Sequence, residues 1–227
     1  MIPQAIVVVT AALTLKSDSE PVRIRVNKPR GSIYWGGAGL NGPYIQDQVS
    51  ALQEAGIKHI WIGKRTYGEY PDAARSATDL RYEGRSDDRS WMIESMENVP
   101  AEQFNLIGYS YGSLMAAHTA HVYACNGHLV DHLVLIASPI DGDFLEKLQQ
   151  NKNIKKVLII DLRQHKDPIY AGMSQWRLIL SKSTLEKQDE ASGTTRGIGH
   201  FYYRPNSDEG KFRRRQLANY LYRQGLR

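Results

Sequence analysis

The sequence holds a single cysteine, Cys125, among its 227 residues. An intramolecular disulfide framework is therefore impossible, and the cysteine content says nothing about an oxidising compartment. Because a lone thiol on a helix-like segment is usually a packing residue, we expect no chemistry from it. His, Cys and acidic residues are not grouped with the spacing of a metal site, so we expect neither a metal nor a cofactor.

Long apolar runs are also missing. The most apolar segment, residues 2–15, is too short to span a bilayer and has no basic region before it. It predicts a strand and the approach to a second one, with a degraded or trimmed signal peptide as the alternative. No obvious signal peptide is present, so the sequence leaves a cytoplasmic and a secreted location equally open.

The charge is only mildly unbalanced. The net charge is +5, with 41% hydrophobic and 23% charged residues, which is typical of a globular protein. The basic residues are dispersed, so we expect no nucleic-acid partner. Arg213–Arg215 form one basic run, which indicates a solvated helix face, peripheral contact with a membrane through phospholipid head groups, or contact with another acidic partner. The oligomeric state stays open.

The chain shows neither internal repeats nor a low-complexity linker, so we interpret residues 1–227 as a single domain. Short apolar runs predict buried parallel strands at 5–13, 31–37, 59–63, 104–109, 132–138 and 156–162. Segments with helical character lie between and after them, at 44–56, 88–98, 113–125, 143–151 and 209–224. This alternation predicts the α/β class, with a mostly parallel central sheet flanked by helices. Residues 64–90 predict a long excursion above the sheet.

The stretch NLIGYSYGSLMAA, residues 105–117, places Ser110 midway between two glycines. An apolar strand precedes the serine and a helix-like run of small residues follows it. A sharp strand-to-helix corner holds such a residue in a strained conformation, and side chains at Gly108 and Gly112 would clash with the main chain. The turn lifts the hydroxyl clear of the sheet and aims the first amides of the helix at the same point.

This arrangement resembles the nucleophile elbow of the α/β-hydrolase superfamily. The resemblance implies that fold with little or no cap domain, and a Ser-acid-His order along the chain. His200 follows a Gly-x-Gly loop near the C-terminus and resembles the catalytic histidine of the family, while His165 is the second choice. The histidine takes the proton of the Ser110 hydroxyl, which is a poor nucleophile without a base.

The acid that orients the histidine follows a late strand in this family. Asp167 precedes Pro168 and Ile169 in a turn of the expected kind, so we favour it over Asp161. Asp141 and Asp143, which follow the preceding strand, remain further alternatives. An aspartate in any of these positions is also common as a helix N-cap or a turn residue.

Acyl transfer also requires donors for the oxyanion. The resemblance implies the backbone N–H of Tyr111 as one donor and a glycine-rich loop, residues 36–39, as the source of the other. We prefer Gly37 to Ala38 for this role, with a simple glycine-rich turn as the alternative. Trp35 stands where the family usually has histidine. Trp35 and Tyr109 are candidate substrate-binding residues, and residues 66–90 are a candidate lid.

These observations favour a serine hydrolase that cleaves a carboxylic ester by way of an acyl-enzyme, of the carboxylesterase or lipase type. The expected substrate is a small-molecule or lipid-like acyl compound, with phospholipids as a subset. Thioesterase and peptidase chemistry use the same triad and remain alternatives. A non-catalytic binding protein of the same fold is disfavoured because serine, acid and histidine are all retained. Residues 36–39 lack the spacing of a nucleotide-binding loop.

Overall fold

A computed structural model describes residues 28–37, 42–63, 96, 99–193 and 196–227. Its centre is one five-stranded sheet in the order β2-β1-β3-β4-β5, in which every pairing is parallel. The strands are β1 (Gly31–Trp35), β2 (Ile60–Ile62), β3 (Phe104–Tyr109), β4 (His132–Ile136) and β5 (Val157–Ile160). Each lies within an apolar run that predicted a strand, so the expected fold class is confirmed. The run at 5–13 lies outside the described residues.

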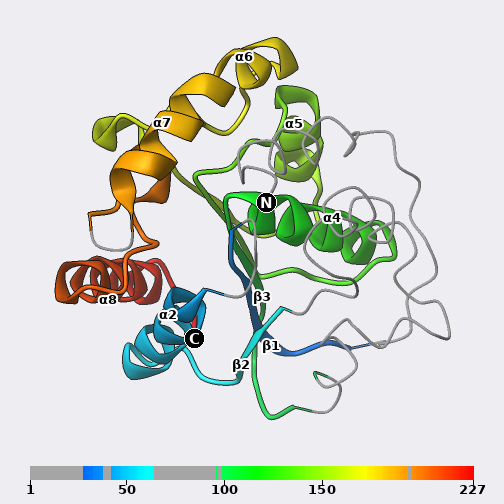
Figure 1. The fold of residues 1–227 in the computed structure, drawn as a ribbon. Coiled ribbons are helices and arrows are strands. Elements are labelled where there is room, and N and C mark those ends of the chain that lie inside the picture. The colour runs from blue at the N-terminus through cyan, green and yellow to red at the C-terminus, as the bar shows by residue number, and fades with distance from the viewer. Residues whose placement is uncertain (1–27, 38–41, 64–95, 97–98, 194–195) are drawn as a thin grey trace, which may run out of the picture.

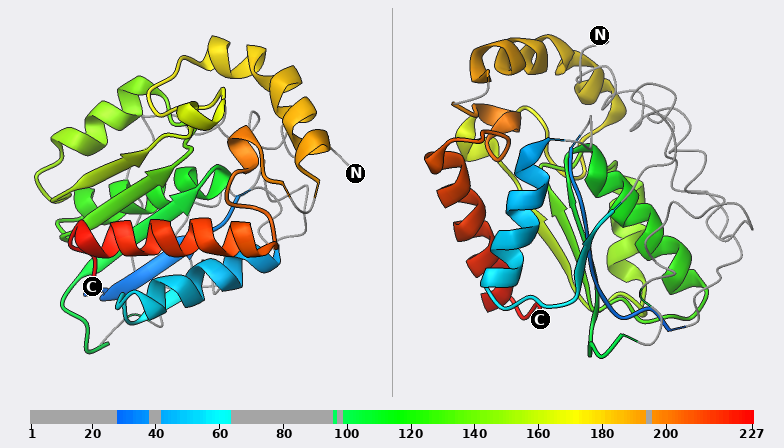
Figure 2. Two further views of the ribbon diagram at one scale, coloured as in Figure 1. Left: turned by 90° about the vertical axis from the view of Figure 1, so that its left-hand side faces the viewer. Right: turned by 60° about the horizontal axis from the view of Figure 1, so that its bottom comes forward.

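Helices cover both faces of this sheet (Figures 1 and 2). On one face lie α2 (Pro43–Glu54) and α8 (Asp208–Arg223), and on the other lie α4 (Tyr111–Cys125) and α5 (Gly142–Gln150). Successive strand residues alternate between two apolar clusters: Ile33 and Leu106 pack toward α4, whereas Tyr34 and Ile107 pack toward α2 and α8. A strand buried on both faces is apolar throughout, which is why the sequence shows runs instead of alternation.

The helix ends follow from local sequence signals. Pro43 occupies the first turn of α2, and Gly56, with a φ of +104°, lies just after its end. The side chain of Ser207 caps α8 by accepting a hydrogen bond from the backbone N–H of Gly210. Helix α4 begins at Tyr111, two residues before the predicted start, so Ser110 directly joins β3 to α4.

Two helices between Asp167 and His200 were not predicted. They are α6 (Gln175–Leu180) and α7 (Lys182–Ser192), which form the yellow and orange arm in Figure 1. The 3₁₀ turns η3 (Arg163–His165) and η4 (Gly199–Phe201) lie on either side of this arm in the sequence. Helix α7 buries only Leu185, Gln188 and Ser192, so it offers no apolar stripe to detect. The predicted excursion at 64–90, and the predicted helix at 88–98 apart from Met96, lie outside the described residues.

The basic run on α8 is largely used inside the protein. Arg213 and Arg214 donate hydrogen bonds to backbone carbonyls of the loop 196–205, and Arg214 also forms an ion pair with Asp47 at 2.6 Å. The accepting carbonyls are those of Arg196, Gly197 and Tyr202 for Arg213, and of Tyr203 and Pro205 for Arg214. The side chain of Arg214 is 0% exposed and that of Arg215 is 56% exposed. A solvated face was therefore the wrong interpretation for Arg214.

Candidate active site

Ser110 lies at the strand-to-helix corner in a strained conformation. Its φ is 54° and its ψ is −123°, a region that residues other than glycine rarely adopt. Its backbone N–H still donates to the carbonyl of Ile136 at 2.8 Å, so β3 keeps its pairing with β4 up to the serine. The carboxyl end of the central strand therefore presents this side chain at the first turn of α4.

The flanking glycines are required by close main-chain contacts. A Cβ at Gly108 would lie 2.2 Å from the carbonyl oxygen of Gly112. A Cβ at Gly112 would lie 2.2 Å from the carbonyl oxygen of Gly36, in the segment that follows β1. Neither distance is tolerable for a methyl group against backbone, so the crowding expected from the sequence is confirmed. The same contacts bring the loop after β1 close to Ser110.

Ser110, His200 and Asp167 form a continuous chain of hydrogen bonds. The Oγ of Ser110 lies 2.6 Å from Nε2 of His200. The Nδ1 of His200 lies 3.1 and 3.0 Å from the two carboxylate oxygens of Asp167. A carboxylate only accepts hydrogen bonds, so this pairing assigns the proton to Nδ1 and leaves Nε2 to accept from the hydroxyl. The fold thus joins three residues that are separated by up to ninety positions.

All three residues are buried: Ser110 is 3%, His200 is 2% and Asp167 is 4% exposed. Hydrogen bonds between such groups are stronger than in water because the surrounding dielectric constant is low. A polar group in such a place is costly unless it is paired, and here each of these side chains has a partner among the other two.

Asp167, the predicted acid, is held by its own turn. After β5, the 3₁₀ turn η3 ends at His165, and the next residue, Lys166, has a left-handed φ of 68° that redirects the chain into Asp167. The backbone N–H of Ile169 then donates to Oδ1 of Asp167 at 2.8 Å. The Asp167-Pro168-Ile169 turn therefore orients the carboxylate toward the histidine.

Tyr109 binds the main chain of His200. Its hydroxyl donates to the backbone carbonyl of His200, and the two rings are stacked with centroids 6.1 Å apart. Burial raises the pKa of Tyr109 well above its usual value, so the phenol stays a neutral donor. The hydroxyl of this candidate substrate-binding residue is thus already used within the protein.

Gly37 lies beside the serine, but its amide has a partner. A Cβ built on Gly37 would lie 3.4 Å from Cβ of Ser110. The backbone N–H of Gly37 donates to the Tyr44 hydroxyl at 2.8 Å, and burial raises the pKa of Tyr44 to about 12. The alternative donor, Ala38, lies outside the described residues, as does the candidate lid at 66–90. Tyr111, the other predicted donor, is the first residue of α4.

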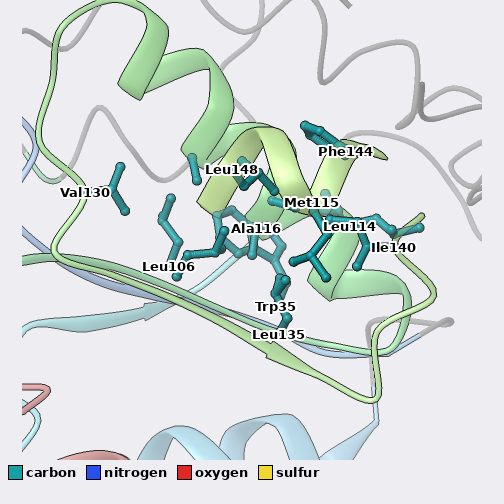
Figure 3. Close-up of a cluster of buried hydrophobic side chains, with 14 of the residues drawn as sticks. Trp35, Leu106, Leu114, Met115, Ala116, Val130, Leu135, Ile140, Phe144 and Leu148 are labelled. Atoms are coloured by element: carbon teal, nitrogen blue, oxygen red, sulfur yellow. The ribbon is translucent and has the colours of Figure 1, made fainter. Parts of the chain in front are cut away.

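Trp35 lies in the hydrophobic core. Figure 3 shows its ring among apolar side chains between the sheet and α4, including Leu106, Ala116 and Leu135. The residue is 1% exposed. Its role as a substrate-binding residue stays a prediction, and the contacts described for it are those of a core side chain.

The alternative acids and base lie in other surroundings. Asp161 and His165 line a cavity of about 370 Å³ between β5, η3 and α8, which is not lined by Ser110, His200 or Asp167. His165 stacks on Tyr202, and burial lowers its pKa. Asp141 caps α5 by accepting from the backbone N–H of Phe144 at 2.9 Å, and Asp143 lies in the first turn of that helix.

Sequence reasoning missed two polar side chains beside the site, Tyr44 and Gln188. Tyr44 contacts the Gly37 amide, and Gln188 contacts the backbone of His200. Neither residue belongs to a motif, so no signal in the sequence pointed to it.

Across the described part of the chain, His, Cys, Asp and Glu do not gather in threes as a metal site would need. Among those same residues, every helix is too short or too polar to cross a bilayer.

Comparison with known families supports the fold from an independent direction. Residues 72–165 match the family model of the α/β hydrolase fold, a segment that contains Ser110, β3, β4 and β5. The comparisons with curated proteins and with solved structures gave no match. The matched segment, the parallel sheet and the serine at the strand-to-helix corner agree: the chain has the α/β-hydrolase fold, and the match over residues 72–165 supports membership of the α/β-hydrolase superfamily.

Proposed function

We propose that this hydrolase cleaves carboxylic esters through Ser110, His200 and Asp167, by way of an acyl-enzyme. The observation that carries the proposal is the unbroken chain from the Ser110 oxygen through both ring nitrogens of His200 to Asp167. Geometry of this kind lets a neutral imidazole remove the hydroxyl proton as the oxygen attacks the acyl carbon.

The reaction proceeds in two halves. The Ser110 oxygen bonds to the carbonyl carbon, and the proton moves to Nε2 of His200, which then gives it to the departing alcohol. Water repeats the sequence on the acyl-enzyme and releases the acid. Asp167 accepts from Nδ1 throughout, so it keeps the ring in the required tautomer and stabilises the imidazolium.

The oxyanion is stabilised in this proposal by the backbone N–H groups of Tyr111 and Gly37. The Gly37 amide donates to the Tyr44 hydroxyl at 2.8 Å, so a substrate oxygen would have to replace that hydroxyl as the acceptor. A neutral hydroxyl is a weaker acceptor than an oxyanion, so the exchange favours the transition state over the resting state.

Esters of lipid-like acids are the preferred substrates within this proposal. Helix α6 exposes Trp176, Ile179 and Leu180, with Trp176 68% exposed, which supports contact with long acyl chains or a lipid surface.

Rates on p-nitrophenyl esters of increasing acyl length, below and above micelle formation, separate esterase from lipase. A higher kcat/KM on acyl-CoA than on the matching ester would favour the thioesterase alternative. A higher kcat/KM on an acyl amide would favour the peptidase alternative.

A fluorophosphonate probe with intact-mass analysis tests the central claim. We expect one added probe per chain, located on Ser110 by peptide mapping, and none on the Ser110→Ala variant. The variant should also lose turnover of p-nitrophenyl butyrate while keeping its near-UV circular dichroism. A label on another residue, or full activity in Ser110→Ala, would rule out Ser110 as the nucleophile.

A further inference from the structure

One side chain of α7 connects the loop that carries Asp167 to the loop that carries His200. The Oε1 of Gln188 accepts a hydrogen bond from the backbone N–H of His200 at 3.0 Å. Its Nε2 donates to the carbonyl of Lys166 at 2.7 Å, and Lys166 immediately precedes Asp167. The primary amide can do both because it carries a donor and an acceptor on one rigid plane.

The histidine loop is shaped to receive this amide. Gly199 has a φ of +58°, and a Cβ there would lie 2.2 Å from Oε1 and 2.3 Å from Cδ of Gln188. A side chain at position 199 would therefore push the amide away from the His200 N–H. Gln188 is itself buried, and it forms hydrogen bonds with main-chain groups that would otherwise need other partners.

The peptide groups around His200 are held from two directions. Gln188 of α7 binds the N–H of His200, and Tyr109 at the end of β3 binds its carbonyl. Because Tyr109 is adjacent to Ser110, this second contact ties the histidine to the nucleophile. The contact through Gln188 ties the histidine to the acid.

Two other residues of α7 contact the same loop without reaching the acid. The Oγ of Ser192 accepts from the backbone N–H of Ile198 at 2.9 Å, and Asp189 pairs with Arg204. Ser192 therefore provides a matched control for Gln188, because it lies on the same helix and also binds one amide of the histidine loop.

We propose that Gln188 is a positioning residue that sets the separation of Asp167 and His200, an inference that rests on the proposed triad. Nδ1 of His200 meets both Asp167 oxygens within 3.1 Å, a geometry that a small relative movement of the two loops would break. Gln188 acts through the main chain of both loops and touches no reacting atom.

The first test compares Gln188→Met with Ser192→Ala in steady-state kinetics on a p-nitrophenyl ester. Methionine has a similar length but neither donates nor accepts a strong hydrogen bond. Since misplacement of a catalytic group by about 1 Å costs about 10²-fold in rate, we expect kcat to fall by roughly that factor with little change in KM. The kcat of Ser192→Ala should fall far less. Rates are expressed per probe-labelled active site, which removes the effect of unfolded protein.

A double-mutant comparison distinguishes positioning from a general structural role. Residues that act as a unit are non-additive, so in an Asp167→Asn background we expect Gln188→Met to cost less than about threefold. An equal loss in both backgrounds, or an unchanged kcat in Gln188→Met alone, would overturn the proposal. If Gln188→Met does not fold, Gln188→Glu keeps the acceptor for His200 but turns an acceptor toward the Lys166 carbonyl, so kcat should again fall, and an unchanged kcat would overturn the proposal.

A second readout does not depend on turnover. In ¹⁵N-histidine NMR of the resting Ser110→Ala protein, we expect the Nδ1–H signal of His200 to broaden through water exchange when Gln188→Met is added. Ser192→Ala should leave the signal sharp. If the wild-type protein lacks esterase activity while Gln188→Met still broadens the signal in the Ser110→Ala background, the proposed function alone fails. An active protein in which Gln188→Met leaves both the signal and kcat unchanged would defeat the positioning role alone.

Discussion

The two halves of the proposed triad are held by different kinds of contact. Around Ser110 the main chain sets the geometry. Ser110, which joins β3 to α4, has a positive φ, and Gly108 and Gly112 allow close backbone approach. Around Asp167 and His200, side chains from distant helices hold loop backbone, as Gln188 and Arg214 do. The turn at Ser110 is contiguous in sequence, whereas Gln188 contacts residues 12 and 22 positions away and Arg214 also pairs with Asp47, 167 positions away. Substitutions far from the chemistry should therefore disturb the acid and the histidine before they disturb the serine.

The largest expected effect comes from the acid. In Asp167→Asn the side chain can donate to Nδ1, which favours the wrong tautomer, so kcat should fall by about 10⁴-fold. That factor corresponds to about 5 kcal/mol of transition-state stabilisation. Steady-state turnover of a p-nitrophenyl ester measures it. Asp161→Asn is the control, because Asp161 faces the cavity beside α8 and pairs with an exposed arginine. A large loss in Asp161→Asn instead would reassign the acid.

The next effect concerns the arginine behind the histidine loop. Arg214→Met leaves Asp47 without its partner and two loop carbonyls without a donor. Removing one member of a buried ion pair costs about 3–5 kcal/mol; because the Asp47 side chain is 26% exposed, we expect a loss at the lower end of that range, which chemical denaturation would detect. Arg215→Met is the matched control on the same helix: its exposed pair with Glu54 is worth about 1 kcal/mol or less. Equal losses in the two variants would show that Arg214 has no special structural role.

The serine half is tested by adding a methyl group to its turn. In Gly112→Ala the new Cβ would lie 2.2 Å from the Gly36 carbonyl oxygen and 2.5 Å from that of Trp35. Overpacking of this kind costs about 1–3 kcal/mol of folding free energy, and the rate of fluorophosphonate labelling should fall as the turn shifts. Gly142→Ala is the control, because the nearest atom to its added Cβ is 3.5 Å away. Unchanged stability and labelling in Gly112→Ala would show that the turn has room to adapt.

The same contrast explains what the sequence could predict. Ser110 was recognisable because strand, glycines and helix are contiguous along the chain. His200 and Asp167 were chosen by resemblance, with His165 and three other aspartates left open, because the distance between loops is set by the whole fold. Gln188 lies on a polar helix without an apolar stripe, and Arg214 lies in a basic run that looks solvated in the sequence. Contacts between a side chain and distant backbone leave no local pattern.

The smallest effect separates the two aspartates that follow consecutive strands. Asp141 follows β4 and caps α5, whereas Asp167 follows β5 and meets His200. Loss of an N-cap costs about 1 kcal/mol, so Asp141→Ala should lower the free energy of unfolding by that amount. Its kcat per labelled active site should remain at the wild-type level, because the carboxylate serves only the N–H of Phe144 among the contacts described for it. A fall in kcat as large as that in Asp167→Asn would restore Asp141 as the acid and place the triad on β4.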